Sequence, residues 1–270
     1  MSTCGVRRQK GLRLSRRDAV FSVAQTNSKK ALLLQSDIIL VTGPLVGASS
    51  WAPTADRLRA GGARVHVPDV LARLGGAPSW SAWTSHLADH LADLAFVDEE
   101  PFLVGHSSAS TLVADLATKM PVRGLIIVDG DIPPASGSAA PVRASFREFI
   151  SGLADEDGLL PPWSQWWVKD RRRSQLVGID SLALDPRSFE SFEMGLPRMT
   201  LSWFDDVIDL APWGHIPAGY IQLSAIYDHA AEEALRRAWP VRRMQGTHLH
   251  PTLKPDETAA AIQAVGRELA

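Results

Sequence analysis

Cysteine is almost absent from this sequence. Cys4 is the only cysteine among 270 residues. A single thiol cannot form a disulfide or a thiolate metal cluster within one chain, and we expect no cysteine nucleophile. A protein without disulfides suits a reducing compartment, so we expect a cytoplasmic location.

Long apolar runs and a strong net charge are also missing. No apolar run approaches the ~18 residues that a membrane-spanning helix needs. The formal net charge is -2, so no overall field attracts nucleic acid or an anionic membrane. We therefore expect a soluble protein with a small-molecule substrate, and with neither nucleic acid nor membrane as a partner. The sequence leaves a homodimer open.

Positive charge is concentrated in residues 1–36. This segment holds a single acid, Asp18, against Arg7, Arg8, Lys10, Arg13, Arg16, Arg17, Lys29 and Lys30. It has no continuous apolar stretch of about 7 to 15 residues, which a secretory signal requires. We expect a basic, poorly ordered arm, with a targeting or polyanion-binding segment as the alternative.

Strand and helix patterns alternate after this arm. Hydrophobic residues make up 45% of the chain and charged residues 21%, which is enough apolar material for a large core. Strands are predicted at residues 37–41, 63–67, 101–104, 125–128, 220–224 and 241–244. Helices are predicted at residues 51–59, 79–94, 108–119, 230–238 and 256–269. This alternation predicts an α/β fold with a mostly parallel sheet flanked by helices.

The alternation fails at about residues 130–217. This stretch is rich in Pro, Trp and charge, and it carries helical pieces but no clear parallel strand. We interpret it as a helical cap inserted into one domain at residues 37–270, since α/β folds reach about 250 residues as single units.

The third predicted strand runs directly into Gly105-His106-Ser107-Ser108-Ala109. This segment fits the pattern G-x-S-x-G, with Ala109 in place of the last Gly. An apolar strand enters the turn and a helix of small residues leaves it, as a strained turn that exposes a nucleophilic serine requires. A serine hydroxyl is a weak nucleophile, so it also needs a base and oxyanion donors.

Further motifs occur in an order that resembles the α/β-hydrolase superfamily. They are Thr42-Gly43-Pro44 after the first strand, Trp51, Gly246-Thr247-His248, and Pro255-Asp256-Glu257 at the start of the last helix. Thr42 departs from the pattern, which usually has His before the Gly. The resemblance covers residue 37 to the C-terminus and implies a capped serine hydrolase.

The resemblance implies a Ser-His-acid triad with Ser107 as nucleophile and His248 as base. His250 competes with His248 locally, but His248 lies at the family's spacing from the Pro. The family usually places the acid after the strand that precedes the His strand, which favours Asp228. Some members place it after the strand that follows the nucleophile helix, and Asp129 occupies that position. A His-x-His pair without clustered acids or Cys is weak evidence for metal, so we assign no metal and no cofactor.

The oxyanion donors and the substrate wall are also implied. One donor should be the backbone N–H of Ser108, and the second should come from the loop after the first strand. Pro44 has no N–H, so we assign the second donor to Leu45. In the cap, Trp163, Trp166 and Trp167 predict an apolar wall that binds substrate, with packing of the cap on the sheet as the alternative.

These features predict a hydrolase of an ester, lactone or thioester of a fairly hydrophobic small molecule, acting through an acyl-enzyme. A fold does not fix the chemistry. One alternative is a non-hydrolytic enzyme of the same fold, such as a lyase, a C–C hydrolase or a cyclase. The other is a ligand-binding or signalling protein with slow turnover.

Overall fold

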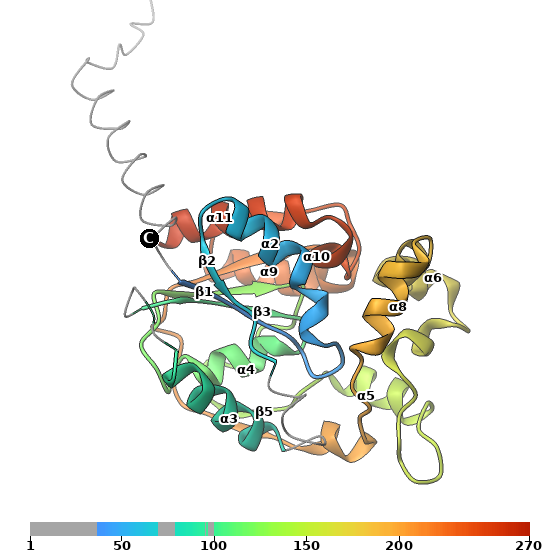
Figure 1. Ribbon diagram of the computed structural model, residues 1–270. Coiled ribbons are helices and arrows are strands. Elements are labelled where there is room, and N and C mark those ends of the chain that lie inside the picture. The colour runs from blue at the N-terminus through green and yellow to red at the C-terminus, as the bar shows by residue number, and fades with distance from the viewer. Residues whose placement is uncertain (1–36, 70–78, 95, 97–99) are drawn as a thin grey trace, which may run out of the picture.

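The fold is known from a computed structural model, which describes residues 37–69, 79–94, 96 and 100–270. The expected basic arm at residues 1–36 lies outside the described residues. Figure 1 shows a central sheet with helices on both faces and further helices beyond one end of the strands.

Six parallel strands form the sheet, in the order β2-β1-β3-β4-β7-β8. The strands are β1 (Asp37–Val41), β2 (Arg64–His66), β3 (Phe102–His106), β4 (Gly124–Val128), β7 (Ala218–Gln222) and β8 (Val241–Arg243). Each of the six overlaps one of the strands predicted from the sequence. The α/β class with a parallel sheet is confirmed.

The central strands are apolar throughout because helices cover both faces of the sheet. Along β1, Ile38 and Leu40 pack toward one face, while Ile39 and Val41 pack toward the other. The first face is covered by α2 (Ala52–Ala60) and α11 (Pro255–Leu269), and the second by α3 (Trp80–Ala92) and α4 (Ala109–Leu116).

Three more helical elements flank the last two strands. They are η5 (Ala225–Tyr227), α9 (Asp228–Arg236) and α10 (His250–Leu253), and η1 (Ala48–Ser50) follows β1. In α9 the side of small residues packs on Ile127 of β4 and Tyr220 of β7. Within the described segments, no helix is both long and apolar enough to cross a bilayer.

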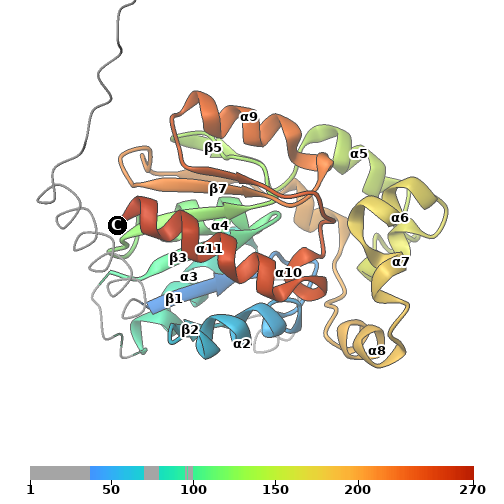
Figure 2. The ribbon, with the colours of Figure 1, turned by 90° about the horizontal axis from the view of Figure 1, so that it is seen from above.

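The insertion between β4 and β7 contains short elements. They are β5 (Gly137–Ala139), α5 (Ala144–Ser151), η3 (Trp163–Trp167), α6 (Arg171–Val177), α7 (Ile179–Leu182), α8 (Pro186–Met194), η4 (Leu201–Asp205) and β6 (Ile208–Leu210). Figures 1 and 2 both place α5, α6 and α8 beyond one end of the sheet. Ligands bind outside the carboxyl ends of the strands in such sheets.

The last part of this insertion is part of the main core. Trp203 packs against Trp80 of α3, with ring centroids 4.1 Å apart. The backbone N–H of Trp80 donates to the carboxylate of Asp206 at 2.7 Å. β6 pairs antiparallel with β5, a short ladder that the sequence pattern did not predict. The insertion therefore consists of a group of short helices followed by a segment that packs against α3.

Candidate active site

Ser107 occupies the sharp turn between β3 and α4. Its φ is 59°, a left-handed conformation that costs free energy in a non-glycine residue. The turn brings α4 close to β3, and a Cβ added at Gly105 would lie 2.8 Å from Val113 Cγ2 and 2.9 Å from the Ala109 carbonyl oxygen. Gly105 is thus needed for the close approach that aims Ser107 away from the sheet.

The loop after β1 lies against the same turn. A Cβ at Gly43 would lie 2.8 Å from Ser108 Oγ, so this glycine allows the two loops to touch. Leu45 and Ser108 line the same two cavities as Ser107. Both residues assigned to the oxyanion hole are therefore beside the serine.

His248 follows β8 and is held from both sides. Its backbone N–H donates to the Leu176 carbonyl oxygen of α6 at 3.0 Å, and the next N–H donates to Val177 at 2.9 Å. The buried ring places Nδ1 2.7 Å from Asp129 Oδ2. Because a carboxylate only accepts, Nδ1–H donates to Asp129, which leaves Nε2 for proton exchange.

Asp129 directly follows β4 and is completely buried. Its Oδ1 accepts from the backbone N–H groups of Leu223 at 2.8 Å and Ser224 at 2.9 Å. Its Oδ2 accepts from the Ser224 hydroxyl at 2.8 Å. These bonds and the one to His248 satisfy a carboxylate that would otherwise be costly to bury. The loop after β7 therefore supplies donors to the carboxylate.

Asp228, the preferred acid of the sequence analysis, is not the partner of His248 in this structure. It begins α9, and its carboxylate accepts a hydrogen bond from the Gln222 side-chain amide. The intervening turn η5 carries Asp228 past the site and puts Tyr227 there instead. The preference for Asp228 is corrected in favour of Asp129, the alternative that the sequence had left open.

His250 is directed away from the serine. Its Nε2 lies 3.3 Å from Glu257 Oε2, and a Cβ at Gly246 would lie 2.3 Å from its Nδ1. The ring thus fills the space beside Gly246 and the start of α11. Of the two histidines, the structure brings His248 to Ser107.

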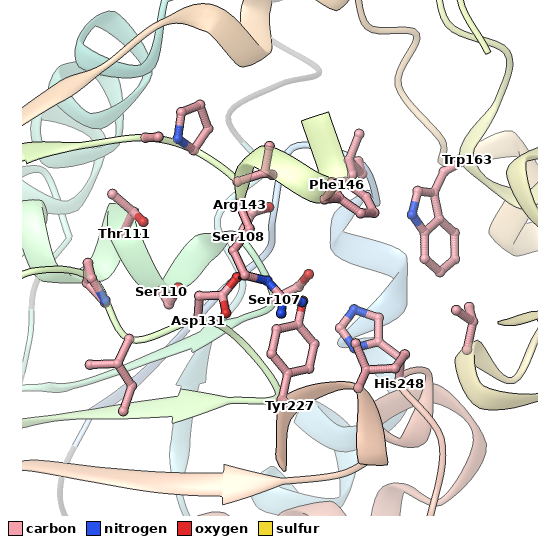
Figure 3. Close-up of a pocket in the computed structure, with 18 of the residues that line it drawn as sticks. Ser107, Ser108, Ser110, Thr111, Asp131, Arg143, Phe146, Trp163, Tyr227 and His248 are labelled. Carbon is pink, nitrogen blue, oxygen red and sulfur yellow. The ribbon is translucent and has the colours of Figure 1, made fainter. Parts of the chain in front are cut away.

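A cavity of about 280 Å³ opens beside Ser107 and His248. Figure 3 shows Ser107 in its middle, with Ser110 and Thr111 on one side and His248, Trp163 and Phe146 on the other. Most of the remaining lining is apolar: Leu45, Ile132, Pro133, Pro134, Ala140, Pro141, Val142, Val177 and Ile226. A cavity of this kind fits a small, largely apolar ligand.

Two of the three predicted tryptophans reach this cavity. Trp163 and Trp167 line it, and the Trp163 ring lies 6.4 Å from the His248 ring between centroids. Trp166 is buried behind them and donates from Nε1 to the Pro161 carbonyl oxygen at 2.8 Å. The aromatic wall therefore consists of Trp163, Trp167 and Phe146, while Trp166 supports it.

Tyr227 is a site residue that the sequence analysis missed. Its ring stacks on His248 with centroids 5.6 Å apart and planes at 26°. Its hydroxyl is hydrogen-bonded to the side chain of Ser107. Burial, with the negative charges of Asp131 and Asp129, raises the pKa of Tyr227 well above its usual value, so the phenol stays protonated at neutral pH.

His106 also packs against the ring of His248. The centroids of His106 and His248 are 4.4 Å apart. Burial lowers the pKa of His106 well below 6.5, and the neighbouring His248 lowers it further. His106 is therefore neutral at pH 7 and adds no positive charge beside the proposed base.

Thr111, Asp131, Arg143 and Phe146 also line the cavity without having been predicted. Thr111 follows Ser107 by four residues, so helical spacing on α4 could have indicated it. The other three lie in the insertion, where no periodic pattern exists. Among the described residues, no cluster of three or more His, Cys, Asp or Glu is arranged to hold a metal ion.

Comparisons with known proteins agree with this architecture. The profile of the Alpha/beta hydrolase family matches residues 38–261. A search of curated proteins finds no match.

Solved structures of the same fold cover most of the chain. One is an extracellular alpha/beta-hydrolase from a Paenibacillus species, described as sharing structural and functional homology with tobacco salicylic acid binding protein 2. It has 18% identity and a TM-score of 0.67, and covers 86% of this chain and 99% of its own. A variant of tomato methylketone synthase I has 18% identity and a TM-score of 0.66, and the match covers 87% of this chain and 99% of the synthase chain.

Polyneuridine aldehyde esterase has 15% identity and a TM-score of 0.65, and the match covers 86% of this chain and 99% of the esterase chain. At these identities the neighbours support the fold alone. The profile match extends over most of the chain, from β1 into α11, and the chain belongs to the alpha/beta hydrolase family.

Proposed function

We propose that this protein is a serine hydrolase that cleaves an ester, lactone or thioester of a small, fairly hydrophobic molecule. The observation that carries the proposal is the buried contact of 2.7 Å between His248 Nδ1 and Asp129 Oδ2, beside a serine at a strained turn. Ser107, His248 and Asp129 would form the triad.

His248 would act as the general base. Asp129 fixes the ring so that Nε2 takes the Ser107 proton, and its negative charge stabilises the imidazolium that forms. Ser107 Oγ attacks the carbonyl carbon, and His248 then protonates the leaving oxygen or sulfur. In the second half of the reaction, His248 takes a proton from water, the water oxygen attacks the acyl carbon, and the proton returns to Ser107 as the acid leaves. Neither half of the reaction needs a cofactor.

The oxyanion would lie in the smaller of two cavities. This cavity has a volume of about 20 Å³ and is lined by Leu45, Ser107, Ser108 and His248 among others. It has room for roughly one water-sized group. The first N–H groups of a helix have no partner within it, so the Ser108 N–H at the start of α4 is suited to donate. The Leu45 N–H would be the second donor, since Pro44 has none.

The same chemistry orients the substrate. His248 must reach the leaving group, so the leaving group lies on the side of the cavity that contains His248, Trp163 and Phe146 (Figure 3). The acyl part then extends toward Ser110 and Thr111. We therefore expect a bulky apolar or aromatic leaving group and a smaller acyl group.

A fluorophosphonate probe tests this function directly. It should label the wild type and the Ser110→Ala variant, which loses a neighbouring serine hydroxyl of the same cavity, but not Ser107→Ala. Wild type should also hydrolyse p-nitrophenyl esters, with activity lost in Ser107→Ala. Absence of a covalent adduct on the wild type would show that Ser107 is not an activated nucleophile, and the proposal would fail.

A further inference from the structure

The cavity beside Ser107 contains a pair of opposite charges. Arg143 and Asp131 both line it, and Arg143 Nε lies 3.0 Å from Asp131 Oδ2. Neither residue belongs to the proposed triad or the oxyanion hole. A charged pair in a mostly apolar ligand cavity usually orients a polar group of the ligand.

Both carboxylate oxygens of Asp131 have a partner within the protein. Its Oδ1 lies 2.7 Å from His229 Nε2, while its Oδ2 is the partner of Arg143. The carboxylate therefore serves to hold other side chains. A guanidinium has five N–H donors, more than one carboxylate oxygen accepts, so Arg143 retains donors for a further acceptor.

Tyr227 also fixes the position of Arg143. The guanidinium carbon lies 5.7 Å from the centroid of the Tyr227 ring, and the Tyr227 hydroxyl is hydrogen-bonded to Ser107. One aromatic side chain thus connects the guanidinium to the reacting serine. Figure 3 shows Asp131, Arg143 and Tyr227 gathered around Ser107.

The position of Arg143 and Asp131 in the cavity indicates which part of the substrate they face. In Figure 3, Asp131 lies on the side of Ser107 that holds Ser110 and Thr111, opposite to His248 and Trp163. If the leaving group lies near His248, as the proposed function requires, the charged pair faces the acyl group.

We propose that Arg143 is a specificity-determining residue that binds an acceptor oxygen, either a ketone or a carboxylate, in the acyl part of the substrate. This inference rests on the proposed function for its orientation. The substrate would combine an apolar leaving group with an acyl chain that carries a second oxygen group. Asp131 and Tyr227 hold the guanidinium in place.

Three p-nitrophenyl esters of similar size test the proposal: the pentanoate, which has an apolar chain, the levulinate, which has a ketone, and the hemisuccinate, which has a carboxylate. We expect wild type to have a higher kcat/KM for one or both oxygen-bearing esters than for the pentanoate. In Arg143→Met, the ratio of kcat/KM for the preferred oxygen-bearing ester to kcat/KM for the pentanoate should fall about tenfold or more, because a charged hydrogen bond is lost. The two oxygen-bearing esters distinguish a ketone from a carboxylate.

Arg173→Met is the matched control. Arg173 lies 3.4 Å from Asp170 in an ion pair and lies over the Phe149 ring at 4.6 Å, so it makes the same kinds of contact away from the cavity. Its substitution should leave the ratio unchanged. An equal fall of kcat/KM for all three esters in Arg143→Met would show a structural role and overturn the inference.

A binding measurement separates this inference from the proposed function. Nitroanilides of the same three acids can be titrated into the Ser107→Ala variant, with tryptophan fluorescence as the readout. The oxygen-bearing anilides should bind more tightly, and Arg143→Met in that background should remove the difference. If wild type hydrolyses no ester but the anilides still discriminate, the proposed function fails and the Arg143 site stands. Equal binding of all three anilides overturns the Arg143 site.

Discussion

Asp129 and His248 are 119 residues apart in the sequence and 2.7 Å apart at Oδ2 and Nδ1. The parallel sheet makes this contact, because both residues follow carboxyl ends of strands, β4 and β8. β7 lies between these two strands, and the loop after it contributes the Leu223 and Ser224 N–H groups that hold the Asp129 carboxylate. Three strands therefore cooperate to orient one imidazole.

Replacing Asp129 should be far more damaging than replacing Asp228. Asp129→Asn removes the charge that stabilises the imidazolium and disturbs the tautomer of His248, so kcat should fall by about 10⁴-fold. Asp228→Asn alters a carboxylate that bonds to Gln222, and kcat should change by less than about threefold. The measurement is kcat on p-nitrophenyl esters.

Folding must be checked for this comparison, because Asp129 also anchors the loop after β7. Ser224→Ala removes one hydroxyl donor to the same carboxylate while leaving its charge. It should lower kcat much less than Asp129→Asn. A larger loss in Asp228→Asn than in Asp129→Asn would return the acid to the position that the sequence first favoured.

The tryptophans of η3 should separate substrate binding from packing. Trp163→Leu removes part of the cavity wall, and KM for an aryl ester should rise about tenfold through lost apolar contact. Trp166→Leu removes a buried side chain that lies behind the wall, so KM should change by less than about twofold. Steady-state kinetics and urea unfolding of both variants measure the two effects.

Trp163→Leu and Trp166→Leu should differ in KM but not in the direction of their stability change. Both should be less stable than wild type, since each loses a buried indole. If Trp166→Leu raised KM as much as Trp163→Leu, the wall would act as one packed unit, and direct contact of Trp163 with the substrate would lose its support.

The centre of the sheet was predictable from the sequence because β1, β3 and β4 are short, buried, mostly apolar runs followed by a turn or helix signal. β1 and β4 are buried on both faces, so their patterns are continuous. The ladder between β5 and β6 was missed, because both strands lie in the insertion, where the alternation of strand and helix patterns fails.

The partner of His248 was less predictable than the proposed nucleophile. Ser107 lies in a motif whose sequence fixes its geometry, whereas Asp129 and Asp228 both follow strands. What separates them is η5, a single turn that moves Asp228 away and brings Tyr227 to Ser107. Arg143 lies in an insertion where the sequence gives no spacing rule, so its place in the cavity follows only from tertiary structure.

The turn at Ser107 should be intolerant of a methyl group at Gly105. Gly105→Ala would put a Cβ within 3 Å of both Val113 and the Ala109 carbonyl oxygen. We expect the free energy of unfolding to fall by at least about 2 kcal/mol because the helix must shift from the strand. Urea unfolding measures this loss.

Gly152→Ala is the matched control for this substitution. Gly152 has φ of -77°, and the nearest atom to an added Cβ is 3.6 Å away. The methyl group should be tolerated, and it should stabilise the protein by about 0.5 kcal/mol through the unfolded chain. Equal stability of the two variants would mean that α4 does not approach β3 as closely as described.

His106 should make stability depend on pH. Burial and the neighbouring His248 hold the pKa of His106 well below the usual 6.5 in the folded protein. At a pH just below 6.5, the ring is therefore still neutral in the folded protein, whereas the same ring in the unfolded chain is protonated. Below pH 6.5 the unfolded state therefore binds more protons, and the free energy of unfolding falls as the pH falls. The slope from this residue approaches about 1.4 kcal/mol per pH unit, until the pH reaches the folded-state pKa.

His106→Phe removes the titrating group but keeps an aromatic ring beside Trp51 and His248. Urea unfolding between about pH 5 and pH 7.5 should show that this variant loses less stability on acidification than wild type. The difference in slope should correspond to at most about one proton taken up on unfolding. The same substitution at exposed His86 should retain the wild-type slope. An unchanged slope in His106→Phe would mean that the buried ring accepts a proton in the folded protein.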